Sequence, residues 1–136
     1  MEEDRLKHSI GVGRKMVEIG KAQGLDDDEL YDLFVLGYNH DIGYEFGNSE
    51  NHAKVGGKIL KNSKYKYWRE VYYHGTINTE YESSYLDILN SADMQINHSG
   101  KDVGFDGRLK DIRERYGAQS NVYKNALILI KRLKNR

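Results

Sequence analysis

The sequence predicts an all-α fold, a compact bundle of about six to seven helices. Apolar residues recur at helical spacings along nearly the whole chain, and no segment alternates apolar and polar residues between turn residues as a half-buried strand does. The 136 residues include no proline and no linker-like stretch. We therefore expect residues 1–136 to form one domain that buries about two-thirds of the surface of the unfolded chain.

The first two helices are delimited by signals at their ends. The first is expected over about Arg5–Ala22. The second opens at Asp26, because Asp26 and Glu29 have the spacing of a capping box, in which each side chain bonds the backbone N–H of the other residue. The apolar stripe of the second helix indicates that it continues to Asp41.

Three more helices are expected in the middle of the chain, after a polar loop at residues 47–50. One begins near His52, and the next carries Tyr65 and Trp68 and ends before Gly75, since glycine suits a helix stop. The third carries the apolar stripe of residues 85–96.

The C-terminal part is expected to form a loop and two helices. The glycine-rich residues 100–107 are typical of a loop, and Ile112 belongs to a short helix that stops at Gly117. Ser120 is placed to cap the last helix. The residues of that helix expected to face inward are Val122, Ala126, Leu127, Ile130 and Leu133.

The amino-acid composition indicates which kinds of partner the protein is expected to bind. The 21 basic residues balance the 21 acidic ones, so no overall field attracts a nucleic acid polymer or an anionic membrane. The absence of cysteine excludes disulfides and thiolate metal sites. The start MEEDRLK has no apolar signal region, and the longest apolar run, residues 126–130, is too short to span a bilayer. We expect a cytoplasmic protein whose partner is a small molecule.

Two polar residues, His40 and Asp41, occupy positions of the second helix that should face the core. His40 and Asp41 continue apolar rows that run through Leu33 and Gly37, so both are expected to point toward the core. An unpaired carboxylate is strongly disfavoured there, and it must be neutralised, hydrogen-bonded or bound to a cation.

The same anomaly recurs on three other predicted helices, where His8, His52 and Asp93 occupy apolar stripes, and His74 follows at a helix end. Imidazoles and carboxylates that converge inside a helical bundle indicate a metal centre with nitrogen and oxygen ligands. Because a single structural zinc is usually satisfied by about four ligands, a larger set indicates more than one ion. Asp41 could bridge two ions ~3.5 to 4 Å apart.

Simpler interpretations exist for each residue taken alone. A lone histidine is more often a core imidazole bonded to a carbonyl, and Asp93 could instead form a buried salt bridge with an arginine. His98 has no apolar context, so we expect a solvated loop residue. Gly56 and Gly57 indicate a close helix crossing, or else room for a ligand beside His52.

In chain order the buried polar residues resemble the pattern H, HD, H, H, D of the HD-domain superfamily of metal-dependent phosphohydrolases. The resemblance covers residues 6 to 97 approximately, in the segments LKHSIGV, GYNHDIGY, ENHAKVGGKIL, YYHGT and ILNSADMQI. The extra histidines look most similar to a small bacterial subfamily that includes symmetrical diadenosine tetraphosphatases.

The resemblance implies a single HD domain, with a metal-site core near residues 6–97 and a C-terminal loop and helices over residues 98–136. It implies two divalent or transition metal ions, with iron as the first expectation and manganese, nickel, cobalt, zinc or magnesium as alternatives. The ligands carried over are His8, His40, Asp41 and Asp93 for one ion, and His52 and His74 for the other, with Asp41 bridging.

The activity implied is hydrolysis of a nucleotide or another small phosphoester or phosphoanhydride by a metal-activated hydroxide. Many family members have a lysine three residues after the HD aspartate, where this chain has Tyr44, whose hydroxyl can donate a hydrogen bond but adds no positive charge. Lys54, Thr76 and Arg108 are further candidates for phosphate contacts, with ordinary surface residues as the alternative.

Two other functions stay open on the sequence. Some HD-fold proteins with the same six ligands resemble di-iron oxygenases, and the scaffold could also serve as a non-catalytic nucleotide-binding module. Exposed residues among the 11 tyrosines could support a homodimer.

Overall fold

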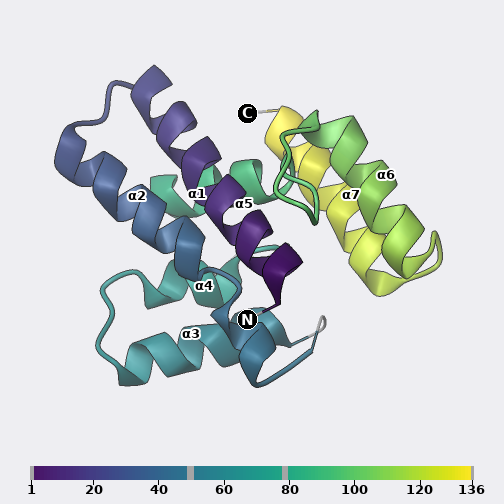
Figure 1. The fold of residues 1–136 in the computed structure, drawn as a ribbon, viewed down its shortest axis with the longest axis horizontal. Coiled ribbons are helices and arrows are strands. Elements are labelled where there is room, and N and C mark those ends of the chain that lie inside the picture. Colours follow the sequence, from purple (N-terminus) through teal and green to yellow (C-terminus); the bar gives the residue numbers. More distant parts are fainter. Residues whose placement is uncertain (1, 49–50, 78–79, 136) are drawn as a thin grey trace.

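The computed structural model describes residues 2–48, 51–77 and 80–135. Over these residues it confirms the all-α fold (Figure 1), with seven α-helices, one short 3-10 helix and no β-structure beyond a single bridge between Ile96 and Asp102. The elements in order are α1 (Glu3–Ala22), α2 (Asp27–Asn39), η1 (Ile42–Glu45), α3 (His52–Asn62), α4 (Trp68–Tyr73), α5 (Ser84–Asp93), α6 (Gly104–Tyr116) and α7 (Asn121–Lys134).

The helices form two groups on either side of α1. In Figure 1, α1 and α2 run side by side, α3 and α4 lie below them, and the hairpin of α6 and α7, in green and yellow, lies on the other side of α1. Helix α5 packs against both α1 and α7 and so joins the two groups. Within the described residues, no helix combines the length and the apolar content that crossing a membrane requires.

The pair of α1 and α2 is fixed by a cap and a close crossing. The predicted capping box is confirmed, since Glu29 N donates to Asp26 Oδ1 over 2.9 Å and Asp26 N donates to Glu29 Oε1 over 3.2 Å. At the crossing, a Cβ added to Gly37 would lie 2.6 Å from Cα of Gly13. The glycines therefore let the two backbones meet.

Helix α2 ends at Asn39, two residues before the predicted end at Asp41. The ring Nδ1 of His40 lies 2.6 Å from the carbonyl oxygen of Gly37, which in a continuing helix would accept from the backbone of residue 41. Asp41 instead precedes η1. Of the loop predicted at residues 47–50, residues 47 and 48 are non-helical, and residues 49 and 50 lie outside the described part of the chain.

The close crossing and the helix stop predicted for α3 and α4 are confirmed, whereas Tyr65 precedes α4, which begins at Trp68. Gly57 lies directly against Tyr72 of α4, with no room for a Cβ, so the two helices cross closely there. Gly75, just past the end of α4, has a φ of 74°, a conformation that favours glycine.

Two clusters of buried side chains form the interior. The larger one lies among α1, α2, α4 and α5, and its fully buried members include Val12, Met16, Leu33, Leu36, Val71 and Leu89. The smaller one joins the end of α5 to α6 and α7 and consists of Met94, Ile112, Ala126, Leu129 and Ile130.

The inner face of α7 agrees with the prediction at Val122, Ala126, Ile130 and Leu133 and differs at Leu127. Ser120 caps the helix as predicted, because its Oγ accepts from Tyr123 N over 3.1 Å. However, Leu127 is 40% exposed, whereas Leu129 is only 3% exposed and packs in the smaller cluster. The prediction for Leu127 was wrong because the direction of this face is set by contact with α5 and α6, not by the apolar pattern of α7 alone.

Helix α6 begins inside the segment predicted as a loop. Gly104 has a φ of 70°, in the region that favours glycine, and the chain turns into the helix at that point. Residues 104–107 are therefore helical, and only residues 100–103 match the prediction. The longer α6 brings its first turns beside α5, where Arg108 donates from Nε to the backbone oxygen of Asp93 over 3.0 Å.

Candidate metal centre

The described structure brings together all six residues predicted as metal ligands. They come from five places in the fold, namely α1, the turn after α2, the first residue of α3, the end of α4 and the last residue of α5. Five of the six are buried and His52 is half-buried. Together they form three overlapping groups of possible ligand atoms within 4.8 Å of one another, namely His8, His40 and Asp41; His40, His74 and Asp93; and Asp41, His52 and His74.

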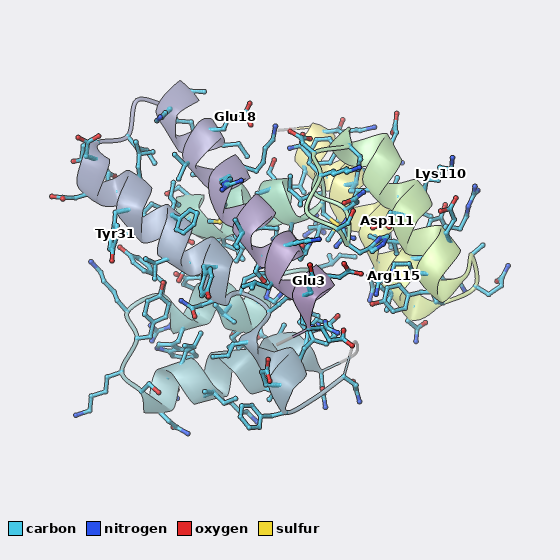
Figure 2. The ribbon with its side chains drawn as sticks, viewed as in Figure 1. Glu3, Glu18, Tyr31, Lys110, Asp111 and Arg115 are labelled. Atoms are coloured by element: carbon cyan, nitrogen blue, oxygen red, sulfur yellow. The ribbon has the colours of Figure 1, made fainter. Side chains whose placement is uncertain are left out.

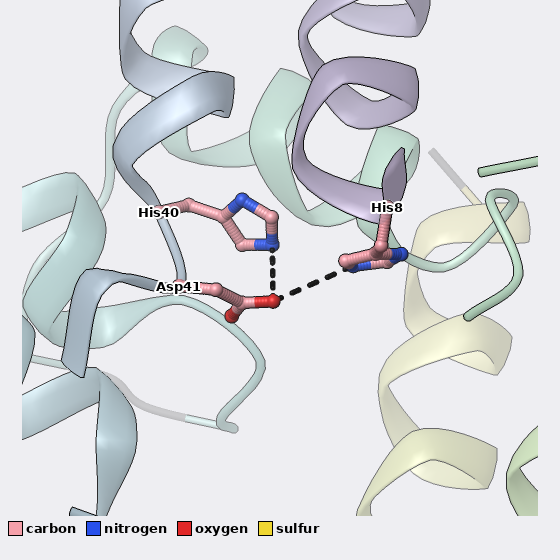
Figure 3. A group of neighbouring side chains, drawn as sticks. All are labelled: His8, His40 and Asp41. Atoms are coloured by element: carbon pink, nitrogen blue, oxygen red, sulfur yellow. Dashed lines mark ion pairs between the residues drawn. The ribbon is translucent and has the colours of Figure 1, made fainter. Parts of the chain in front are cut away.

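Asp41 lies at the middle of this arrangement. Its Oδ2 is 3.3 Å from Nε2 of His40 and 3.6 Å from Nε2 of His8 (Figure 3). Its Oδ1 is 3.4 Å from Nε2 of His52 and 3.5 Å from Nε2 of His74. The two oxygens of one carboxylate therefore face two different pairs of histidines, which is the arrangement that a carboxylate bridging two ions requires.

Three of the histidines have their tautomer fixed by the backbone. Nδ1 of His8 lies 2.9 Å from the carbonyl oxygen of Asn97, and Nδ1 of His40 and of His74 each lie 2.6 Å from a carbonyl oxygen, of Gly37 and Val71 respectively. A carbonyl only accepts, so each Nδ1 must carry the proton and donate. When these rings are neutral, each Nε2 presents its lone pair to the centre, as metal-ligating histidines do.

His40 provides an independent indication of a missing partner. Its Nε2 is buried and has no hydrogen bond of acceptable geometry within the described structure. A buried polar atom without a partner costs about 1–3 kcal/mol. A cation held by His40 and its neighbours would satisfy this nitrogen, and nitrogen and oxygen donors suit iron, manganese, nickel, cobalt or zinc. The buried histidines and aspartates can thus hold metal ions.

The charges of the centre are balanced internally. Burial alone would lower the pKa of His40, but the carboxylates of Asp41 and Asp93 outweigh burial and hold that pKa well above 6.5. Burial alone would raise the pKa values of the two carboxyls, but the surrounding histidines hold both well below the usual range. His52 differs, because burial and neighbouring His74 lower its pKa to about 4. His52 is therefore neutral at pH 7 even without a cation.

The sequence allowed two roles for Asp93, a metal ligand or a salt bridge with an arginine, and its surroundings are compatible with both. Its Oδ1 lies 2.9 Å from Nε2 of His8 and 3.6 Å from Nη2 of Arg108. Arg108 thus lies at the rim of the centre, anchored to the backbone of Asp93. A salt bridge to an arginine and membership of a possible ligand group coexist at this residue.

A cavity of about 370 Å³ opens onto the centre. The hairpin of α6 and α7 forms one wall, and the N-terminal part of α1 and η1 form the other. Of the candidate substrate contacts, Tyr44, Thr76 and Arg108 line this cavity, whereas Lys54 is exposed and does not. Lys54 lies two residues after His52 in α3, so its side chain leaves the helix on nearly the opposite side.

Tyr44 belongs to a stack of three side chains at the cavity wall. Its ring lies 4.2 Å from that of His52, with 16° between the planes, and the guanidinium carbon of Arg5 lies 3.7 Å from the centre of the Tyr44 ring. Burial and the charge of Asp41 raise the pKa of Tyr44, so its hydroxyl stays protonated and can donate. Sequence reasoning missed Arg5, although it precedes His8 by one helical turn and so shares its side of α1.

The expectation that His98 is a solvated loop residue is confirmed, since it lies in the turn after α5 and its side chain is 41% exposed, but the residue also has a partner that the sequence did not indicate. His98 lines the cavity, and its Nδ1 lies 2.5 Å from Oδ1 of Asp111. Because Asp111 follows 13 positions later and on another element, no local pattern could have indicated this contact.

Comparison of the chain with protein-family models, with curated proteins and with solved structures finds no match.

Proposed function

We propose that this protein is a metal-dependent phosphohydrolase that acts on a nucleotide or another small phosphoester or phosphoanhydride. The observation that carries the proposal is the position of Asp41, whose two oxygens face two pairs of histidines beside a cavity of about 370 Å³. Cavities of this size accept small molecules. Two-metal centres bridged by a carboxylate are common in enzymes that hydrolyse phosphate esters.

The residues would divide between two ions as the resemblance implies. One ion would be held by His8, His40, Asp41 and Asp93, and the other by Asp41, His52 and His74. When bound, such ions supply an activated water and offset the charge that develops on the phosphoryl group.

The rest of the cavity supports an anionic substrate. Three arginines line it, namely Arg5, Arg108 and Arg115. Guanidinium groups match phosphate oxygens in geometry and charge. The hydroxyl of Tyr44 would add a neutral donor, and together these groups would hold and orient the phosphate.

The test compares two aspartate variants after metal analysis of the purified protein. We expect about two transition-metal ions per chain, and hydrolysis of at least one compound in a panel of diadenosine tetraphosphate, nucleoside monophosphates and cyclic dinucleotides. Asp41→Asn should lose hydrolysis and most of the metal while keeping its helical content by circular dichroism. The matched control is Asp106→Asn, because Asp106 is an exposed carboxylate on α6 that pairs with Lys134 and does not line the cavity.

The same panel without dioxygen separates the hydrolase from the alternatives. Undiminished anaerobic turnover supports the hydrolase, whereas turnover that requires dioxygen and a redox-active iron pair assigns the centre to an oxygenase. Tight nucleotide binding without product under any metal would favour a binding module. No bound metal, with no activity restored by iron, manganese, nickel or cobalt, would overturn the proposal.

A further inference from the structure

A second hydrogen-bonded group lies beside the metal centre, outside the set of possible ligands. Nδ1 of His98 lies 2.5 Å from Oδ1 of Asp111, and the other oxygen of Asp111 accepts from Nη1 of Arg108 over 2.7 Å. The same oxygen accepts from the backbone N–H of His98 over 3.1 Å. Figure 2 shows Asp111 and Arg115 on the side of α6 toward α1, whereas Lys110 points away.

This group is tied to the centre through Arg108. The guanidinium donates from Nε to the backbone oxygen of Asp93, and its Nη2 lies 3.6 Å from Oδ1 of Asp93. His98 is therefore connected to Asp93, a possible metal ligand, by three successive contacts through Asp111 and Arg108, and His98 and Asp93 line the same cavity. The position of the imidazole relative to the centre is fixed by side chains of α6.

The hydrogen bond to Asp111 defines what the ring of His98 can do. Because the carboxylate accepts, Nδ1 carries a proton, and Nε2 is the nitrogen left for the cavity. Within the described structure Nε2 of His98 has no partner, and the side chain is 41% exposed. An aspartate behind an imidazole holds the ring in one orientation and one tautomer, as in other acid–base pairs of this kind.

We propose that His98, oriented by Asp111, is the acid that protonates the leaving-group oxygen of the phosphoester. This inference rests on the proposed function. The bond between phosphorus and the leaving oxygen breaks, its electron pair stays on that oxygen, and the oxygen takes the proton of Nε2. Water forms the new bond to phosphorus and gives up one proton. The neutral His98 then regains a proton from solvent, so the net change is ester plus water to alcohol plus phosphate.

The role of Asp111 is that of a positioning residue. It touches His98 and Arg108 and is not required to touch the substrate. A purely structural role would be to pin residue 98 through its backbone N–H, which Asp111 also does. The two roles differ in one measurable way, because loss of a proton donor affects only substrates whose leaving group needs a proton, whereas a distorted loop affects all substrates alike.

The experiment uses the metal-loaded full chain and two aryl phosphates. Phenyl phosphate has a poor leaving group that needs a proton, and 2,4-dinitrophenyl phosphate has a good one that does not. His98→Gln should lower kcat for phenyl phosphate by roughly 100-fold and leave kcat for the dinitrophenyl ester nearly unchanged. Asp111→Asn should show the same selectivity with a smaller loss, and Asp106→Asn, on the same helix, should change neither rate.

Each other outcome overturns the inference in a distinguishable way. If His98→Gln lowers both rates equally, or neither, His98 is not the acid, although the hydrolase itself stands. If the wild-type protein hydrolyses neither these esters nor any compound of the nucleotide panel with any metal, the proposed function fails and the inference fails with it. Loss of helical content by circular dichroism in both variants would assign the pair to folding instead.

Discussion

Nε2 of His52 lies 3.1 Å from Nε2 of His74. His74 donates a hydrogen bond from Nδ1 to the carbonyl oxygen of Val71, so its Nε2 is an acceptor whenever the ring is neutral. Both nitrogens also lie within 3.5 Å of Oδ1 of Asp41. Two nitrogens and one oxygen that converge in this way could hold a cation.

Replacing His52 should reduce the number of metal ions bound per chain less than replacing His40. His52 belongs to one of the three ligand groups and is half-buried, whereas His40 belongs to two of them and is completely buried. We expect His52→Ala to retain about one of two ions per chain and His40→Ala to retain less. Elemental analysis by mass spectrometry measures both. The control is His98→Ala, a histidine of the same cavity outside the ligand groups, and equal losses in all three variants would contradict the assignment.

Metal binding at neutral pH should release a proton from His40. Asp41 and Asp93 hold the pKa of His40 well above 6.5, so the metal-free chain carries a proton there at pH 7 that a cation must displace. His52, with a pKa of about 4, has no proton to give. We expect a net release of about one proton per chain and an affinity that falls as the pH falls. Titration calorimetry in buffers of different ionisation enthalpy checks this, and heats that do not depend on the buffer would contradict it.

The helical pattern predicted which site residues point inward, but it did not predict the hydrogen bonds that these residues form. His40, Asp41 and Asp93 could be placed inward from sequence because helical periodicity fixes which way a side chain points. The contacts that set the chemistry could not be placed in this way. The Nδ1 bond of His40 depends on where α2 ends, and the contact of His98 with Asp111 depends on how α6 packs against α5. Both are consequences of tertiary structure that local patterns do not contain.

The same distinction explains the errors outside the site. The amphipathic pattern of α7 does not determine which flank of its apolar stripe is buried, and contact with α5 and α6 selected Leu129 over Leu127. In the segment before α6, glycine content predicted a loop, but Gly104 uses its conformational freedom to enter a helix. Composition identified the residue that permits a turn without indicating that a helix begins there.

The crossing of α1 and α2 should tolerate no side chain at Gly37. A Cβ there would lie 2.6 Å from Cα of Gly13 and 2.9 Å from Sδ of Met16. Helix propensity favours alanine over glycine by about 1 kcal/mol. Because this effect alone would stabilise the variant, a net loss of stability would show that the added Cβ clashes with α1. We expect Gly37→Ala to lower the free energy of unfolding by about 1–3 kcal/mol, measured by urea denaturation.

The control for this substitution is the neighbouring residue. Tyr38 follows Gly37 in α2 and is 41% exposed, so Tyr38→Ala changes the outer face of the same helix turn. It should alter stability much less than Gly37→Ala and leave bound metal unchanged. Because the crossing holds the rings of His8 and His40 with centroids 5.3 Å apart, Gly37→Ala should also reduce the metal content. Normal stability and full metal in that variant would contradict the packing argument.

Arg5 should contribute to substrate binding without contributing to metal binding. Its guanidinium carbon lies 3.7 Å from the centre of the Tyr44 ring, and Tyr44 stacks on His52, so the charge is held at the cavity wall. Loss of a charged hydrogen bond to phosphate corresponds to a KM higher by roughly 10-fold or more. We therefore expect Arg5→Gln to raise KM for the hydrolysed phosphoester and to retain both ions.

Two further variants isolate the cause. Arg14→Gln removes an exposed arginine of the same helix that does not line this cavity, and KM should stay at the wild-type value. Tyr44→Phe keeps the ring on which Arg5 stacks and removes only the hydroxyl, so a KM increase in this variant would measure the tyrosine's own donor. If Arg5→Gln loses metal along with affinity, the stack acts by supporting His52, and a direct contact between Arg5 and the phosphate is excluded as the explanation.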